Sequence, residues 1–350
     1  MRLVGQIQIT VRGNSVMRDP SMWERLKGGL GAKLDLDTGE VQNELEATAV
    51  VDTTRRALTK LGVSNALSLV IDDTVIFTDT ESRADDLGDM ILALSEHSSV
   101  FGRGFKELRF AAEHEEAGLH LVIETRARTK HLRAEPAAMI SIGGRIRALE
   151  PKPSESAEAY QARVEPMVKQ AGMLESARLS FESFVARLQA VLSAALPDSS
   201  VVVVKTESRL IKPSSRQVAG AEKPPTQPLH PGYDPFVTYY PSPMGMMLDV
   251  MLFSTMMHMM MPSPMMLYSP AGAAIAPMSD VQADPVLASD ESIAAADEGS
   301  SVDWGASDGQ QGDSTDYGGD DSSSVWDSGD SGDTGGDFGD GGGDFGGGFD

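Results

Sequence analysis

Hydrophobic and polar residues alternate along several segments of the chain, and a period of two is typical of half-buried β-strands. The first segment shows this clearly, because Leu3, Ile7 and Ile9 are separated by polar residues. The pattern predicts strands over 1–11, 44–51, 66–71, 75–77, 107–114, 119–126, 139–149 and 201–211. Since these strands pair locally, we expect a mainly antiparallel sheet.

Two residue pairs are expected to form tight turns. Asp72 and Asp73 connect two apolar runs, in a composition typical of a hairpin. Gly143 and Gly144 are expected to bend the segment 139–149 back on itself, because glycine readily adopts the positive φ that such a turn needs.

Apolar residues spaced three and four apart predict helices. Asp19 followed by Pro20 begins one short helix, and Ser82 begins another. Asp52 is expected to cap a third, which ends at Gly62.

The strongest periodicity lies between 174 and 195. Apolar residues recur there in alternating steps of three and four, at Leu174, Ala177, Phe181, Phe184, Leu188, Val191 and Ala195. This stripe predicts a long helix that packs on the sheet of its own domain, and a homodimer through the 174–195 helix is the alternative. The patterns together predict an α+β fold. A mainly antiparallel sheet is covered by two or three short helices and one long helix, and a disordered C-terminal region follows.

The composition changes after residue 212. We expect an α+β globular domain over 1–212, a proline-rich linker over 213–243 and a methionine-rich apolar segment over 244–278. The remainder, 279–350, is rich in glycine, aspartate and serine. It has no aliphatic face to offset the entropy of ordering, so we expect an acidic, disordered tail.

Charge divides the chain at a similar place. All 29 Lys and Arg residues lie at or before Lys223, whereas residues 224–350 contain 21 of the 52 acidic residues. The net charge is therefore −2 before residue 224 and −21 from there on. A near-neutral folded part argues against direct nucleic-acid binding, which needs a basic face. The chain contains no cysteine, which excludes disulfides, thiolate metal sites and catalytic thiols.

Motifs for chemistry are weak throughout. His114 and His120 lie close together in sequence, but pairing the apolar faces of their strands puts Ala112 opposite Leu121 and turns the two histidines to opposite faces. This favours a solvated hairpin end over a metal site. No glycine-rich sequence has the spacing of a phosphate-binding loop, and no serine lies in a nucleophile elbow. We therefore expect no cofactor, and no local sequence motif indicates a catalytic residue.

The methionine-rich segment has three interpretations. Its thioethers suit an adaptable apolar contact with a partner or with a second copy, and we assign this contact to Met256, Met257, Met259 and Met260. Contact with a membrane through 244–261 is the second interpretation, with the folded domain in the cytoplasm because basic residues precede the segment and none follows it. Binding of copper(I) is the third interpretation, through these four methionines and Met261 around His258.

The tail carries isolated aromatic residues within its negative charge. We expect Phe338, Phe345, Phe349 and the final Asp350 to engage a partner with a basic surface, the charge speeding encounter and the rings fixing the complex. In composition the tail resembles the glycine-rich linker and acidic, Phe-ended tip of bacterial single-stranded DNA-binding proteins. The folded part does not show the basic, aromatic-bearing barrel of that family, so no family is assigned.

The sequence therefore predicts a non-catalytic protein-interaction module, bacterial in type. A membrane-associated protein anchored through 244–261 is the first alternative, and an enzyme whose site is assembled from distant residues is the second. The first segment alternates and is not an unbroken apolar run, so it does not resemble a secretory signal, and we expect a cytoplasmic protein with membrane association as the variant.

Overall fold

The computed structural model describes residues 1–11, 39–79, 105–129, 136–213, 230, 232–257 and 265–283. All of them belong to one folded unit, Met1–Val302. The helices expected to begin at Asp19 and Ser82 lie outside the described residues, as does the expected tail from residue 284 onward.

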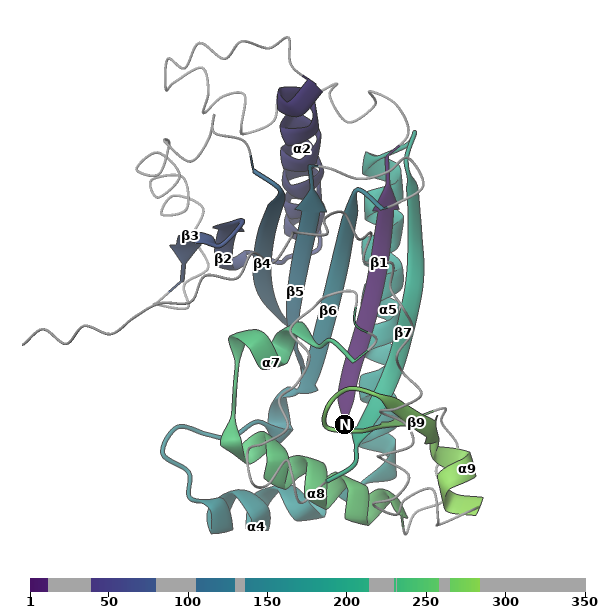
Figure 1. Cartoon of the computed structure of the whole chain (residues 1–350). Coiled ribbons are helices and arrows are strands. Elements are labelled where there is room, and N and C mark those ends of the chain that lie inside the picture. The colour runs from purple at the N-terminus through teal and green to yellow at the C-terminus, as the bar shows by residue number, and fades with distance from the viewer. Residues whose placement is uncertain are drawn as a thin grey trace, which may run out of the picture. The chain divides into compact units, whose positions relative to one another are not determined.

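The described strands form one nine-stranded sheet in the order β3-β2-β4-β5-β6-β1-β7-β8-β9 (Figure 1). They are β1 (Arg2–Thr10), β2 (Asn65–Ile71), β3 (Thr74–Thr78), β4 (Glu107–Glu116), β5 (Leu119–Arg128), β6 (Ala138–Ile146), β7 (Ser200–Ile211), β8 (Met265–Tyr268) and β9 (Ala274–Pro277). Neighbours are antiparallel except β7 and β8, which are parallel. The predicted α+β class with a mainly antiparallel sheet is confirmed.

Two of the hairpins are closed by turns that contain residues with positive φ. The predicted hairpin of β2 and β3 is confirmed, and Asp72 at its turn has a φ of 51°. Ala117 and Gly118 connect β4 to β5 with φ of 51° and 78°, as a two-residue turn with two positive φ values requires.

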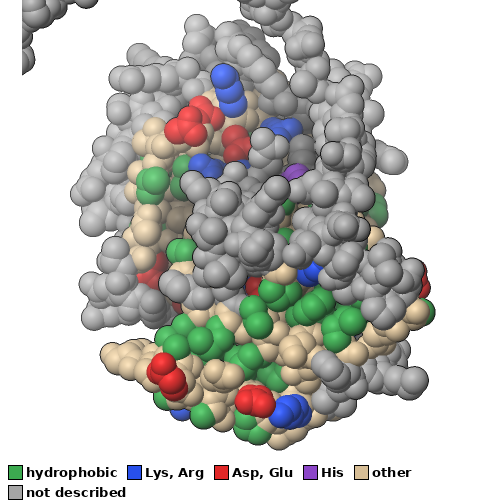
Figure 2. Space-filling view, turned by 60° about the horizontal axis from the view of Figure 1, so that its bottom comes forward, with side chains coloured by type: hydrophobic (Ala, Val, Ile, Leu, Met, Phe, Trp, Pro, Cys, Tyr) green, Lys and Arg blue, Asp and Glu red, His purple; other side chains and the backbone are tan. Residues whose placement is uncertain are grey.

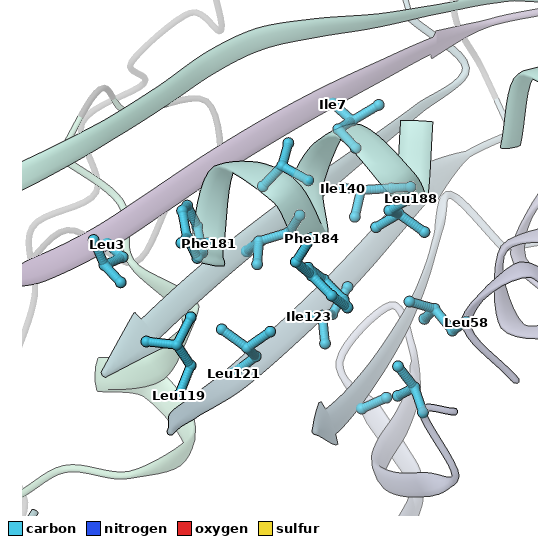
Figure 3. Close-up of a cluster of buried hydrophobic side chains, with 14 of the residues drawn as sticks. Leu3, Ile7, Leu58, Leu119, Leu121, Ile123, Ile140, Phe181, Phe184 and Leu188 are labelled. Carbon is cyan, nitrogen blue, oxygen red and sulfur yellow. The ribbon is translucent and has the colours of Figure 1, made fainter. Parts of the chain in front are cut away.

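Two long helices, α2 (Gly39–Lys60) and α5 (Ala171–Ala195), cover one face of the sheet, which we call the helical face (Figure 1). Between sheet and helices lies the main hydrophobic core. Figure 3 shows aliphatic side chains of the strands, such as Leu121 and Ile140, against Phe181 and Phe184 of α5.

The strand expected over 44–51 is wrong, because this segment belongs to α2. Its buried residues Ala47, Val50, Thr54 and Leu58 recur at helical spacing, and this continues the pattern that the sequence predicts only from Asp52 onward. The predicted end of this helix at residue 62 is confirmed, since α2 ends at Lys60 and Gly62 has a φ of 87°.

The stripe of α5 contacts the sheet of the same chain, as the intradomain alternative predicts. Five of its seven expected residues are buried, and Leu192 and Leu196 continue the stripe where Val191 and Ala195 were expected. A shorter helix, α4 (Ala157–Val168), precedes α5 and contacts it.

The turn expected at Gly143 and Gly144 is wrong, because β6 runs straight through both residues. The two glycines allow close approach instead. A Cβ on Gly144 would lie 3.1 Å from side-chain atoms of Leu121 and Phe181 on the helical face, and a Cβ on Gly143 would lie 2.5 Å from Asp234. Because β6 has no side chain at these two positions, residues on both faces of the sheet approach its backbone closely.

The register of the β4–β5 hairpin is shifted by two residues from the expected one. Ala112 pairs with Ile123, and His114 pairs with Leu121. The expected division of faces is nevertheless confirmed, since His114 contacts the ring of Phe184 on the helical face and His120 lies on the other face.

The folded part continues past the boundary expected at 212. Residues 232–283 add α7 (Pro235–Tyr239), α8 (Pro243–Met257), β8, β9 and α9 (Met278–Ala283). Strand β8 pairs with the end of β7, and Leu252 and Leu267 belong to the main core. Part of the segment expected to be a linker, and the beginning of the expected tail, are therefore ordered elements of the same unit.

Strand β7 departs from the expected buried run of four valines. Val201 is buried, whereas Val202 and Val204 are about half exposed. A register shift opposite Gln6 and Ile7 of β1 interrupts the pairing in this part of the strand.

Candidate functional site

The face of the sheet opposite the helices carries charged residues at alternate strand positions, and we call it the polar face. In β5, Leu121 and Ile123 point to the helical face, so His120 before them and Glu124 after them point to the other face. Both are buried. A charged group excluded from water needs a partner, so the question is what covers them.

Residues 232–240, which we call the strap, lie over β5 and β6 on the polar face (Figure 1). The strap begins α7 with an Asp-Pro pair. Asp234 accepts a hydrogen bond from the Phe236 N–H at 3.1 Å, and Pro235 occupies the first turn, where a missing N–H costs nothing. Gly143 lies directly beneath, which lets the strap backbone contact the sheet.

Glu124 is the central anchor of the strap. It is fully buried and accepts hydrogen bonds from the hydroxyls of Tyr233 at 2.9 Å and Tyr239 at 3.0 Å. Arg126 pairs with the same carboxylate at 2.5 Å. Burial, together with the charge of Glu124, raises the pKa of both tyrosines, so both hydroxyls remain protonated donors.

A second group of charges fixes the start of the strap. Arg145 of β6 pairs with Asp234 and stacks on the ring of Phe236, with 4.6 Å from the guanidinium to the ring centroid. Burial alone would raise the pKa of Asp234, but the charges of Arg145 and Arg2 lower it below its usual value. Arg209 is buried and its guanidinium lies 3.4 Å from the carbonyl oxygen of Tyr233.

His120 lies between two carboxylates, which corrects the expectation of a solvated hairpin end. Its Nδ1 is 2.6 Å from Glu150 and its Nε2 is 3.2 Å from Glu113, and Tyr240 of the strap also donates to Glu113. Burial alone would lower the pKa of His120, but its hydrogen bonds with the two carboxylates raise it to about 9. The hydrogen bond from His120 lowers the pKa of Glu113 to about 2.

These shifts determine what the cluster can do chemically. A general acid or base works best with a pKa near the operating pH, whereas His120 is held protonated at pH 7 and Glu113 is held ionised. The tyrosines of the strap are likewise held protonated. The polar face and strap therefore form a network of fixed charges that attaches the strap to the sheet.

Sequence reasoning missed this network. The available signals were the three tyrosines at 233, 239 and 240 within a proline-rich segment, and the ionisable residues at alternate positions of β5. The pairing of Glu124 with residues more than a hundred positions later depends on tertiary packing, so no local pattern indicates it.

Helix α8 contains the methionine-rich sequence and is apolar on nearly all sides. One face packs inward, where Leu252 and Met256 belong to the core and Asp249 pairs with Arg2 at 2.8 Å. The opposite face carries Val250 and Ser254, and it is bordered by Met247 and Met257, which also pack partly against the core. Val250 is 44% exposed, and the two methionines are partly buried.

The structure separates the residues that the sequence assigned to partner contact. Met256 is fully buried in the core, so it cannot contact a partner while the domain is folded, and this assignment is corrected. Met257 is partly exposed and borders the outer face of α8. Outside the described residues lie Met259, Met260, Phe338, Phe345, Phe349 and Asp350.

Apolar side chains gather at the end of the molecule where α4 and α8 lie side by side, with a few charged groups beside them (Figure 2). A soluble protein rarely presents a contiguous apolar area without a function for it. We call the outward face of α8, defined by Met247, Val250 and Met257, the α8 surface.

Among the described residues, no group of three or more His, Asp or Glu side chains is arranged to hold a metal ion. No described helix has the combined length and apolar character needed to cross a bilayer. Comparison with known proteins adds no assignment, because no family model, no curated protein and no solved structure matches the chain.

Proposed function

We propose that this protein is a non-catalytic interaction module that binds a protein partner through the α8 surface. The observation that carries the proposal is a helix whose inner face belongs to the core while Val250 on its outer face is apolar and 44% exposed. Methionine suits such a contact, because its unbranched, polarizable side chain adapts to differently shaped partners.

The polar face supports the same proposal. Its ionisable groups are paired with one another and their pKa values are moved away from neutrality, which favours a structural over a catalytic role. In this view the pair of Arg2 and Asp249 holds the middle of α8 against the start of β1.

The partner is expected to be basic around an apolar centre. Residues 224–350 contain 21 acidic side chains and no Lys or Arg, so we expect this part of the chain to attract positive charge. Complementary charge speeds encounter and adds specificity, whereas the apolar centre supplies most of the affinity.

A photo-crosslinking residue at Val250, introduced into the full chain in its own cell, tests the proposal. We expect one predominant protein adduct, and no such adduct from the same residue at Gln161, an exposed polar position on neighbouring α4. With the purified partner, Val250→Asp should weaken binding by about tenfold or more. Binding should also weaken as salt rises, because salt screens the opposite charges.

Two results would contradict the proposal. Equal adducts from Val250 and Gln161 would show that the α8 surface has no preferred contact. Unchanged affinity for the Val250→Asp variant, with a native circular dichroism spectrum, would place the contact elsewhere on the chain.

Membrane contact through the same helix is the alternative function. An apolar helix face can lie in the interfacial region of a bilayer without crossing it. Flotation of the full chain with zwitterionic vesicles, lost in the Val250→Asp variant, would favour this alternative. If the protein stays with the soluble fraction in both forms, the membrane contact is excluded.

A further inference from the structure

Strand β7 has two edges, and one of them is largely open among the described residues. Along one side it pairs with β1 from Ser200 to Arg209. On the other side β8 pairs only with Ser208–Ile211. On that second side the stretch from Ser200 to Glu207 therefore has no described strand beside it, and in Figure 1 this part of β7 forms the margin of the sheet.

This open stretch is unusual among sheet margins in length and composition. Eight residues span about 26 Å, and four of them in succession are valines, which have a high β-propensity. Val202 is 49% exposed and Val204 is 51% exposed. The outermost strands are protected differently, since β3 and β9 are short and β9 ends in Pro277, which cannot donate a ladder hydrogen bond.

The geometry points to a second copy of this chain as the occupant: we propose that two copies pair antiparallel through residues 200–207 of β7 and form one continuous sheet. This inference goes beyond the proposed function, because it uses a different surface and a different partner. A two-fold axis perpendicular to the sheet makes such an edge self-complementary. Main-chain hydrogen bonds would supply the pairing, as in strand addition generally.

Charge and apolar contacts select the register. If Val203 lies opposite Val203 of the second copy, Val202 lies opposite Val204, so the half-exposed valines cover one another. Lys205 then faces Val201 and not another charge. A register centred on Lys205 would instead place two lysines opposite each other, which is destabilising. The register centred on Val203 is therefore the expected one.

The long α5 helix does not compete for this role, since its apolar stripe is already covered by the sheet. The sequence gives self-association through the 174–195 helix only as the alternative to packing on the sheet, and we assign self-association to the β7 edge. The bulge opposite Gln6 and Ile7 adds local twist to β7, so the pair is expected to be reversible and concentration-dependent.

Single cysteines give a sharp test because the chain has none of its own. Directly opposed residues of antiparallel strands have Cα atoms about 4.5 to 5.5 Å apart, which suits a disulfide. Val203→Cys should therefore form a covalent dimer rapidly under mild oxidation. Ser200→Cys is the matched control, because in this register the two Ser200 residues lie about 20 Å apart.

The mass of the full chain provides the second measurement. Sedimentation from about 1 to 200 µM should show a monomer–dimer equilibrium that Val204→Lys shifts to monomer. Because Val204 is half exposed, we expect the Val204→Lys variant to keep its fold, and a native circular dichroism spectrum will show this. A monomer at every concentration, or equal cross-linking of the Val203→Cys and Ser200→Cys variants, would overturn the inference. Neither result bears on the α8 surface, which the Val250→Asp variant tests separately.

Discussion

Replacing Gly143 with alanine tests whether the strap depends on a sheet without a side chain beneath it. The added Cβ would lie 2.5 Å from Asp234 Oδ1 and 3.0 Å from the Phe236 backbone nitrogen. The first distance falls 0.9 Å short of the 3.4 Å at which ordinary van der Waals contact begins. Backbone cannot rotate away as a flexible side chain can, so the strap itself must move.

The expected loss in the free energy of unfolding follows from the contacts that this movement of the strap disturbs. Overpacking in a well-packed site costs about 1 to 3 kcal/mol. Lifting the strap also stretches the hydrogen bond from the Phe236 N–H to Asp234 and the ion pair of Asp234 with Arg145, and weakening charged hydrogen bonds adds about 1 to 2 kcal/mol. We expect Gly143→Ala to lower the free energy of unfolding by about 2 to 5 kcal/mol.

Two other glycines provide graded controls. A Cβ on Gly144 would lie 3.1 to 3.2 Å from its nearest side-chain atoms, which can shift by a few tenths of an ångström, so we expect a loss of about 1 to 2 kcal/mol. Gly245 lies in α8 with nothing within 4 Å of the added atom. Alanine there should stabilise the protein by about 0.5 to 1 kcal/mol, because glycine weakens a helix.

Equilibrium unfolding in urea, followed by far-ultraviolet circular dichroism, measures these changes. The reasoning is refuted if Gly143→Ala lies within about 0.5 kcal/mol of the unchanged protein, the spread of ordinary neutral substitutions. It is also refuted if Gly144→Ala costs more than Gly143→Ala.

Three further predictions concern charge and packing. Because the pKa of His120 is raised to about 9, its contribution to stability is complete below about pH 6.5, the unfolded pKa, and is lost as pH rises through 9. Urea unfolding at several pH values should show this decline, and His120→Gln should reduce its slope. Met256→Ala should cost about 2 to 5 kcal/mol because its side chain is fully buried, and Met257→Ala should cost clearly less in the same assay. Glu124→Gln should cost about 3 kcal/mol by leaving the charge of Arg126 poorly compensated, and equal stability of this variant would show that the strap does not rely on that carboxylate.

Much of the sheet could be predicted because local patterns of apolar and polar residues indicate its strands. The alternation around Ile7 and around Leu121 sets which side chains face the core, and this division is correct even where the register is shifted by two residues. Register is harder to predict, because a shift by two preserves the pattern and only the turn fixes it. Here the turn is set by Ala117 and Gly118.

The errors occur where one local pattern fits two structures. Apolar residues near Val50 fit both a strand and a helix, and contact with the sheet decides for the helix. Gly143 fits both a turn and a close approach, and only the position of the strap distinguishes them. Both errors concern contacts with residues far away in the sequence.

Less of the candidate site could be predicted from the sequence, because it too depends on contacts between distant residues. The sequence identifies the methionine-rich segment as unusual, but the inward position of Met256 and the outward position of Val250 depend on which face of α8 meets the core. The tyrosines that contact Glu124 and His120 come from a segment whose prolines indicate a linker. Proline content therefore indicates an irregular backbone but not whether that backbone is packed.

The position of β1 affects the order in which this chain can fold. Strands β2, β4, β5 and β6 lie side by side in the sheet in the order in which they occur in the chain, so they can form before the more distant pairings of β1. Leu3, at the very start of the chain, pairs with Gly144 on one side and Ser208 on the other. Closing such long loops is entropically costly, so β1 is expected to insert late, after α5 and β7 have been synthesised. Until then the edges of β6 and β7 are both exposed, and the nascent chain is most prone to aggregation during this interval.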